Sequence, residues 1–236
     1  MTILLSKLFS EKALEELMNI IGEIPLAIWD TLYMTLLSTL FAVILGLPLG
    51  VLLVVGDKGG IMPLPRWLMG TLGVVINILR SVPFIILMVL VVPLTRLIVG
   101  TSLGTEAVIV PLTIAAFPFV ARLVEGSLRE VDPNLIEAAQ SMGATPFQII
   151  VKVMIPESVP SLVSNLTVAL TTILGYGAMS GALGGGGLGK IAIDYGYYRY
   201  QELVLVVCVI RHILLVQLIQ MLGTYLSKRL DKRLKK

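Results

Sequence analysis

Cysteine, histidine and charge are all scarce in this sequence. Its 236 residues include one cysteine, Cys208, so no disulfide can form within the chain and no cysteine cluster can hold a metal ion. The one histidine, His212, cannot make a metal site alone, and no serine–histidine–aspartate set is evident. Charged residues make up 14% of the chain, against about 25% in soluble domains. We therefore expect no metal site, no disulfide framework and no ordinary soluble domain.

Apolar residues are in excess, at 56% of the chain. Soluble domains contain roughly 45–50%, and no water-soluble core could hide the surplus, which must face lipid. A spanning helix needs about 20 mostly apolar residues. We predict an all-α, polytopic membrane protein with five transmembrane helices, over residues 31–56, 81–99, 106–124, 162–183 and 203–226.

The stretch from residue 67 to 99 is too long for one span and too short for two spans with a loop. We expect an interfacial helix over residues 64–79, then Arg80 at the inner surface, then the second span. A span that began at Trp67 would place Arg80 inside the membrane, where an arginine is costly.

Residues 1–28 do not read as a signal peptide, because they carry several glutamates and lack a small-residue cleavage site. We predict that they form an N-terminal amphipathic extension. Apolar positions recur there at helical spacing, and Ser10 can cap a helix that lies at the membrane surface. Residues 29–222 are the predicted transmembrane domain, and residues 223–236 are a basic cytoplasmic tail.

The basic residues predict the orientation. Residues 228–236 hold six Lys and Arg residues, and such a run after an apolar helix is typical of a cytoplasmic end rather than of nucleic-acid binding. Five spans then place the N-terminus outside and the C-terminus inside, and most other basic residues fall on the inner side, as the positive-inside rule requires. We expect a multi-pass protein of the cell membrane, surrounded by lipid, with no nucleic-acid partner.

Residues 132–156 predict two short helices hinged at a glycine. The expected capping residues are Asp132 and Pro133 before the first helix, Gly143 after it, Thr145 with Gln148 at the start of the second helix, and Pro156 at its end. Helices this short are marginal alone in water, so the pair needs a surface to pack against. That surface is either another protein, with Ala138 and Ala139 allowing close approach, or the chain's own spans.

The run Glu137-Ala138-Ala139, then Gly143, then Val153-Met154-Ile155-Pro156 resembles the EAA loop of binding-protein-dependent ABC importer permeases of type I. The glycine and the proline at matching offsets make the resemblance specific. Residues 77–87, 142–146, 175–182 and 185–189 are similar to the methionine-importer permeases, so that the resemblance covers about residues 29–222. The resemblance implies that the loop is a cytoplasmic helix-turn-helix that couples to an ATPase through Glu137, Ala138, Ala139, Met142, Gly143 and Pro156.

The same resemblance implies a set of partners. Two copies of this subunit would form the translocation pathway for a small amino acid, with methionine as the first candidate and another small amino acid or related solute as the alternative. A cytoplasmic ABC ATPase would bind ATP and magnesium, so this chain would hold no cofactor and would not be an enzyme. An extracytoplasmic substrate-binding protein would deliver the solute.

Further site candidates follow from the resemblance and from charge. The pore or gate candidates are Tyr176, Met179 and Arg211, and the candidates for docking the binding protein are Gly185, Gly186, Gly187 and Tyr195. Met179 either closes the pore by excluding water or only packs. Arg211 and His212 point about 100° apart on a helix, so at most one faces the pore squarely. Arg211 either meets a substrate carboxylate or pairs structurally where two copies meet.

Residues 184–190 follow the pattern G-x-x-x-x-G-K, which is close to a phosphate-binding loop. Ile191 stands where Ser or Thr should reach magnesium, no buried strand precedes the loop, and the expected topology places it outside. We therefore expect these glycines to form a tight fold at the outer mouth.

Two other function classes compete with the importer. A passive channel or secondary transporter should carry intramembrane acids for ion coupling, and these are scarce here. A membrane enzyme should present converging polar groups at the membrane face, and we find none.

Overall fold

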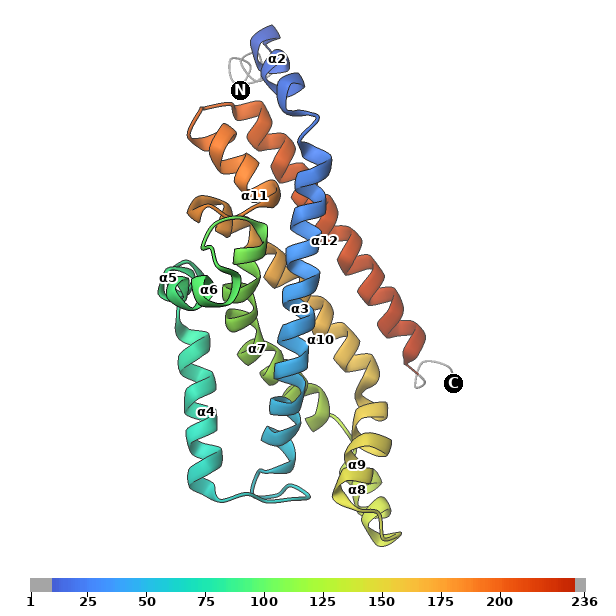
Figure 1. Cartoon of the computed structure of the whole chain (residues 1–236). Helices are drawn as coiled ribbons and strands as arrows, with labels where there is room; N and C mark the ends of the chain where they lie inside the picture. The colour runs from blue at the N-terminus through green and yellow to red at the C-terminus, as the bar shows by residue number, and fades with distance from the viewer. Residues whose placement is uncertain (1–9, 232–236) are drawn as a thin grey trace. The chain divides into compact units, whose positions relative to one another are not determined.

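The computed structural model describes residues 10–231, and its regular elements in that range are all helices (Figure 1). Contacts divide the chain into two compact units. Unit 1 is built from Met1–Ser38, Pro83–Thr113 and Leu170–Leu218, and unit 2 is built from Thr39–Val82, Ile114–Ala169 and Ile219–Lys236. Each unit consists of three separate segments of the sequence, because the unit boundaries fall inside long helices.

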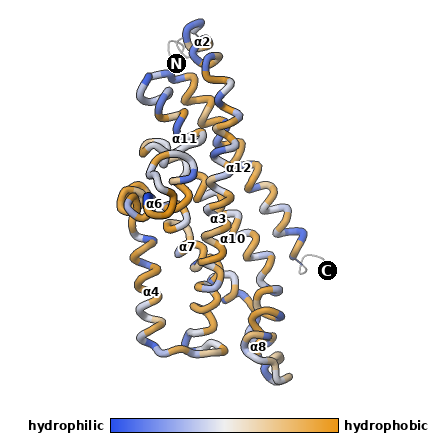
Figure 2. The backbone as a smooth tube through the Cα atoms, in the orientation of Figure 1, coloured by the Kyte–Doolittle hydropathy of each residue, from blue (hydrophilic) through white to orange (hydrophobic). Residues whose placement is uncertain are grey.

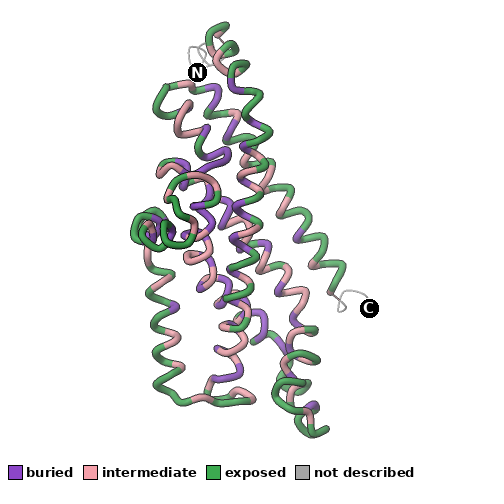
Figure 3. Tube along the Cα trace, in the orientation of Figure 1, coloured by how far each residue is buried: buried purple, intermediate pink, exposed green. Residues whose placement is uncertain are grey.

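Within residues 10–231, four helices are long and apolar enough to cross a membrane: α3 (Ile24–Val55), α7 (Thr105–Arg129), α10 (Ile155–Ser180) with its flanking turns, and α12 (Glu202–Leu230). Apolar residues run along all four (Figure 2). In the apolar stretch that could span a membrane, 56% of the residues of α7 are buried, against 17% of those of α12. Figure 3 shows the exposed length of α12. The chain is therefore a polytopic membrane protein in which α7 is the more buried helix and α12 keeps most of its apolar surface uncovered.

The expected second span is not one helix. The chain forms α4 (Arg66–Ser81), α5 (Phe84–Leu90) and α6 (Val92–Val99), so the prediction of a continuous span over residues 81–99 is wrong. Pro83 explains the break, because it has no N–H for a helical bond and it forces Val82 into an extended conformation with ψ at 124°. A fifth span exists if the broken pair α4 and α5 counts as one.

The N-terminal helix α2 (Glu11–Ile20) begins as predicted, with the Ser10 hydroxyl accepting a hydrogen bond from the Ala13 N–H at 3.3 Å. Helix α3 begins at Ile24, earlier than predicted, and α12 extends to Leu230. The basic tail beyond Asp231 lies outside the described residues.

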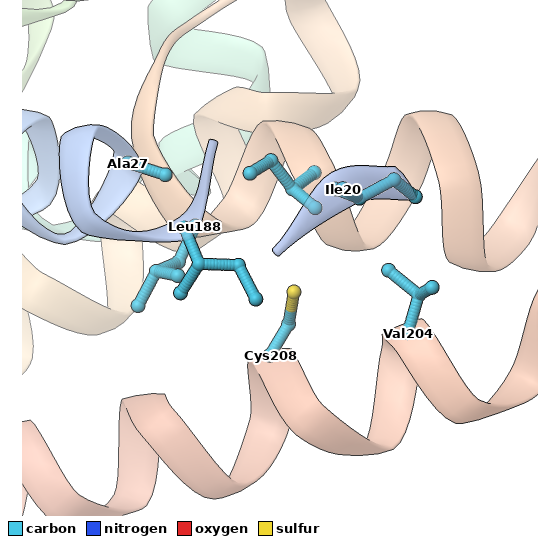
Figure 4. Packing of buried hydrophobic residues seen from close by; sticks show 7 residues of the cluster. Ile20, Ala27, Leu188, Val204 and Cys208 are labelled. Carbon is cyan, nitrogen blue, oxygen red and sulfur yellow. The ribbon is translucent and has the colours of Figure 1, made fainter. Parts of the chain in front are cut away.

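The core of unit 1 ties α2 and α3 to α11 (Gly187–Ile191) and α12. Its buried cluster consists of Ile20, Ile24, Ala27, Leu188, Ile191, Val204 and Cys208. In Figure 4 the Cys208 sulfur points into this cluster, beside Ile20 and Leu188. Cys208 is 2% exposed, so it fills the core.

Small residues bring α3 and α7 together in unit 2. A Cβ atom at Gly46 would lie 2.8 Å from the Phe117 carbonyl oxygen, and one at Gly50 would lie 2.6 Å from the Ala121 carbonyl oxygen. Such close approach of two backbones favours glycine over any larger residue.

The loop predicted to hold two hinged helices forms α8 (Pro133–Ser141) and α9 (Pro146–Ile149). The prediction that Pro156 ends the second helix is wrong, since the chain continues through a π-helical turn, η1 (Ile150–Met154), into α10. A π turn widens the backbone ladder and gives room for a proline ring that would clash in a regular helix. The second short helix is therefore the start of a long one.

Candidate functional site

Local capping fixes the shape of the α8 and α9 pair in unit 2. The Asp132 carboxylate accepts the Asn134 N–H at 2.9 Å, and Gly143 ends the first helix with φ at +78°. The Ala144 N–H donates to the Ala139 carbonyl oxygen at 3.1 Å, which closes the turn. The left-handed stop at Gly143 is confirmed.

The second helix begins with the predicted capping box. The Gln148 N–H donates to the Thr145 hydroxyl at 3.4 Å, and the Thr145 N–H donates to the Gln148 side-chain oxygen at 2.9 Å. Both exchanges satisfy donors at the helix start that would otherwise lack partners. The pair is a rigid projection, not a loose linker.

The side chains of this projection divide into two sets. Ala139 and Ile149 are buried within the chain, where α8 contacts η1. Met142 is 81% exposed and Phe147 is 73% exposed, with Leu135, Glu137 and Ala138 also open to solvent. We call the exposed set Leu135, Glu137, Ala138, Met142 and Phe147 the α8/α9 surface.

Two large apolar side chains with no cover are a sign of an interaction site. The sequence analysis did not predict Phe147 as a site residue. An aromatic residue between Pro146 and Gln148, in a polar stretch, is a signal that could have identified it. One face of the projection therefore packs on the chain itself, while the other remains exposed, and docking of that face on another protein stays a prediction.

An ionic network holds the α3–α4 connection against α7. Arg129 contacts Asp57 at 2.9 Å and Glu125 at 3.0 Å, and Arg122 contacts Glu125 at 2.7 Å. The hydrogen bond from Arg129 holds the pKa of Asp57 below its ordinary value. The sequence predicted that most basic residues lie on the inner side of the membrane, but it did not predict this pairing with Asp57 and Glu125.

Unit 1 contains an apolar cavity of about 570 Å³ between α10, α11 and α12. Met179, which is 51% exposed, lies on its wall together with Cys208, Val209, His212 and Gln217. The His212 ring nitrogen lies 3.5 Å from the Leu174 carbonyl oxygen. Arg211 is exposed and is not among the lining residues, so of the two neighbours it is His212 that faces this cavity.

Tyr176, the other gate candidate on α10, stacks on Phe84 of α5. Their ring centroids are 4.9 Å apart, and their planes differ by 6°. The stack anchors the start of α5, whose Phe84 is itself buried. Tyr176 is thus placed by packing and is not part of the cavity wall beside Met179.

The glycine-rich turn is a packing device. Gly185, Gly186 and Gly187 are all buried, and a Cβ at Gly187 would collide with the Thr31 hydroxyl. Gly187 also has φ at +75°, which favours glycine. This burial argues against direct contact between these glycines and a docked protein.

Tyr195 is the more accessible docking candidate. Its hydroxyl donates to Glu23 at 3.5 Å, and the Arg199 guanidinium lies 4.4 Å from the centre of its ring. Arg199, Tyr197, Tyr198 and Tyr200 beside it are exposed. These exposed side chains, unlike the buried glycines, are accessible to another protein.

The nucleotide-like pattern at residues 184–190 has no strand before it: a 3-10 turn, η2 (Gly181–Leu183), precedes it. Among residues 10–231 no three or more His, Cys, Asp or Glu side chains are grouped so that they could hold a metal ion. The residues described at these sites therefore form a helical scaffold that carries the exposed α8/α9 surface and, in unit 1, an apolar cavity.

The known proteins that this chain resembles are membrane components of transport systems. The family described as "Binding-protein-dependent transport system inner membrane component" matches residues 42–236. The probable D-methionine transport system permease protein MetI of Vibrio cholerae serotype O1 is 52% identical over 210 residues, which cover 88% of this chain and 92% of that protein. The D-methionine transport system permease protein MetI of Escherichia coli K12 is 51% identical over 154 residues, or 65% of this chain and 70% of that protein.

Two solved structures extend the comparison. An inward-facing conformation of the MetNI methionine ABC transporter matches with a TM-score of 0.89 at 45% identity, over 91% of this chain and 99% of that one. The crystal structure of an amino acid ABC transporter with histidines matches with a TM-score of 0.73 at 18% identity, over 90% of this chain and 97% of that one, which shows a common fold alone.

Proposed function

This chain belongs to the family of binding-protein-dependent transport system inner membrane components, and from that premise we propose that it is the permease subunit of an ATP-driven importer of methionine. The observation that carries the proposal is the 45% identity and TM-score of 0.89 with a methionine ABC transporter over 91% of the chain. The relatives named as D-methionine permeases support the same substrate.

ATP is hydrolysed on a separate ATPase subunit in this proposal, because the glycine-rich turn of this chain lacks the Ser or Thr that reaches magnesium. The α8/α9 surface docks in a groove of that subunit. Met142 and Phe147 enter the groove, and Glu137 pairs with a basic side chain at its edge. Ala139 and Gly143 hold the projection in shape, while Pro156 follows the π turn that joins it to α10.

The mechanism is alternating access driven from outside the chain. ATP binding closes the two ATPase subunits, which displace the α8/α9 surface, and hydrolysis resets the inward-facing state. A ligand shifts such an equilibrium only by its difference in affinity for the two states. The rigid caps at Asp132 and Thr145 matter because a soft projection would absorb the displacement instead of passing it to α10.

Two copies of the chain form the pathway in this proposal. The face of α12 that is uncovered within one chain, including Arg211, meets the second copy, since a charged side chain is costly in lipid. Met179 narrows the pathway as an apolar constriction that excludes water. The N-terminus is outside and the C-terminus inside, and a substrate-binding protein docks on the outer side near Tyr195.

The test is uptake by the purified complex in proteoliposomes. We expect accumulation of radiolabelled methionine that requires ATP, the ATPase subunit and the binding protein, with unlabelled methionine as the strongest competitor. Uptake at the same rate without ATP would assign the chain to a passive pathway instead. Stronger competition by another amino acid would keep the importer and replace the substrate.

A further inference from the structure

Unit 2 contains a second cavity, of about 530 Å³, between the α3–α4 connection, α4 and the last turns of α7. Four basic side chains line it, Lys58, Arg66, Arg122 and Arg129, together with two carboxylates, Asp57 and Glu125. Four positive charges against two negative ones leave a formal excess of two positive charges. A partly enclosed site with that excess attracts an anion.

Two of the cations are fixed in place. Arg129 bridges Asp57 and Glu125, and Arg122 also reaches the Asn77 side-chain oxygen at 3.2 Å and the Gly73 carbonyl oxygen at 3.5 Å. Both carboxylates are already paired with arginine, so they help to place the guanidinium groups on the cavity wall.

The other two cations are free to take a ligand. Lys58 and Arg66 are exposed, and within residues 10–231 neither side chain makes an ion pair. They lie at the two ends of the connection between α3 and α4, and both line the same cavity. A ligand with two or more acceptor oxygens can meet both of them.

The surroundings indicate which anion. The cavity lies where the spans α3 and α7 end and where α4 begins, which is where lipid headgroups lie against a membrane protein. Leu53, Leu64 and Met69 add apolar wall. Beyond the cavity α4 exposes an apolar strip, with Trp67 72%, Val74 56% and Ile78 59% exposed.

We propose that this cavity, the α4 pocket, binds the phosphate group of an anionic phospholipid, whose acyl chains lie along the exposed strip of α4. Basic pockets between membrane helices are suited to such headgroups. A free phosphate offers the same oxygens, but it has no acyl chains to cover the apolar strip of α4. The assignment does not depend on which solute the chain transports.

The first experiment is native mass spectrometry of the purified complex, released from mixed micelles that contain cardiolipin, phosphatidylglycerol and phosphatidylcholine. We expect the anionic lipids to be retained over phosphatidylcholine. In the double variant Lys58→Gln/Arg66→Gln, the fraction of complexes that retain an anionic lipid should fall about tenfold. The reason is that each basic residue near a membrane surface contributes to the attraction of anionic lipids.

The matched control is Lys228→Gln/Arg229→Gln, which removes the same two charges from the exposed end of α12. It should retain the anionic lipids within twofold of the unchanged chain. An equal loss in both variants, or no loss in either, would overturn the pocket. Binding of inorganic phosphate in this pocket with no anionic lipid retained would overturn the lipid assignment and give the site to free phosphate.

A second measurement needs no change in the pocket. The chain has two tryptophans, so Trp29→Phe leaves Trp67 as the reporter beside Arg66. In vesicles, brominated phosphatidylglycerol should quench Trp67 fluorescence at least twofold more than brominated phosphatidylcholine at the same fraction. Equal quenching by both lipids contradicts the proposal.

Discussion

The Leu188 N–H donates a hydrogen bond of 2.9 Å to the Thr31 hydroxyl, across 157 residues of sequence. The same hydroxyl donates to the Ala27 carbonyl oxygen at 2.8 Å, so this fully buried group is satisfied as both acceptor and donor. Gly187 lies directly against it. One threonine of α3 thereby fixes the turn that begins α11.

Gly187→Ala should destabilise the protein by about 2 kcal/mol or more, because the new Cβ would meet the Thr31 hydroxyl and the residue has a positive φ. The measurement is the thermal unfolding midpoint in detergent. Gly22→Ala is the control, since nothing lies within 4 Å of a Cβ there. Equal midpoints for the two variants would show that the turn is not held as described.

Substitutions at Gly143 test the projection, because they separate the effect of backbone strain from that of a steric clash. Its φ is +78°, yet nothing lies within 4 Å of a Cβ built there. Gly143→Asn should keep ATP-driven uptake near normal, because asparagine tolerates the left-handed region, whereas Gly143→Val should reduce uptake at least tenfold. ATPase activity measured beside uptake should remain in Gly143→Val, which is the signature of uncoupling; a loss of both activities together would point to misfolding instead.

Cysteine crosslinking tests which side of α8 faces the ATPase. Met142→Cys and Phe147→Cys should crosslink to the ATPase subunit in membranes, and Ala139→Cys should not, because Ala139 is 4% exposed while the other two are over 70% exposed. The native Cys208 is buried and gives the background. Crosslinking from position 139 alone would mean that the projection turns its other face to its partner.

Features set by neighbours in the sequence were the ones that the sequence predicted well. Ser10, Gly143 and the Thr145–Gln148 box all act within four residues of the chain, and each cap is present. The apolar runs that became α3, α7, α10 and α12 were equally plain, since lipid demands length and apolarity above all else.

Features set by distant contacts were not predictable from the sequence. The burial of Gly186 and Gly187 depends on Thr105 and Thr31, which are far away in the chain. Composition does not reveal the π turn that carries the helix past Pro156. The inward direction of Ala139 and the outward direction of Ala138 depend on how α8 lies against η1.

The Asp57–Arg129 pair should be insensitive to pH across the physiological range. The hydrogen bond from Arg129 lowers the pKa of Asp57 below its ordinary value. A carboxyl with a depressed pKa stabilises the fold above its unfolded value, and this contribution is lost only as pH falls through the folded value. The destabilisation by Asp57→Asn should therefore be constant from pH 8 to pH 5, at about 1 kcal/mol or less since both side chains are half-exposed. A difference that disappeared near pH 6 would contradict the pairing.

Arg211 and His212 should respond differently to the same substitution. His212 lines the apolar cavity in unit 1, whereas Arg211 is exposed on a helix that is apolar enough to span a membrane. A guanidinium there is costly in lipid, and a second copy of the chain can supply its partner. Arg211→Gln should weaken the dimer by about 1.5–3 kcal/mol, the usual contribution of a hydrogen bond to a charged group, while His212→Gln should leave it intact.

Dilution in detergent, with the dimer fraction followed by light scattering, measures that difference. The KM for methionine separates this role of Arg211 from contact with the substrate. A dimer unchanged in Arg211→Gln, together with a KM raised at least tenfold, would place the guanidinium on the substrate carboxylate instead. With the dimer weakened and KM unchanged in complexes that remain assembled, the charge serves the junction between copies, because loss of a substrate contact would raise KM even in an intact dimer.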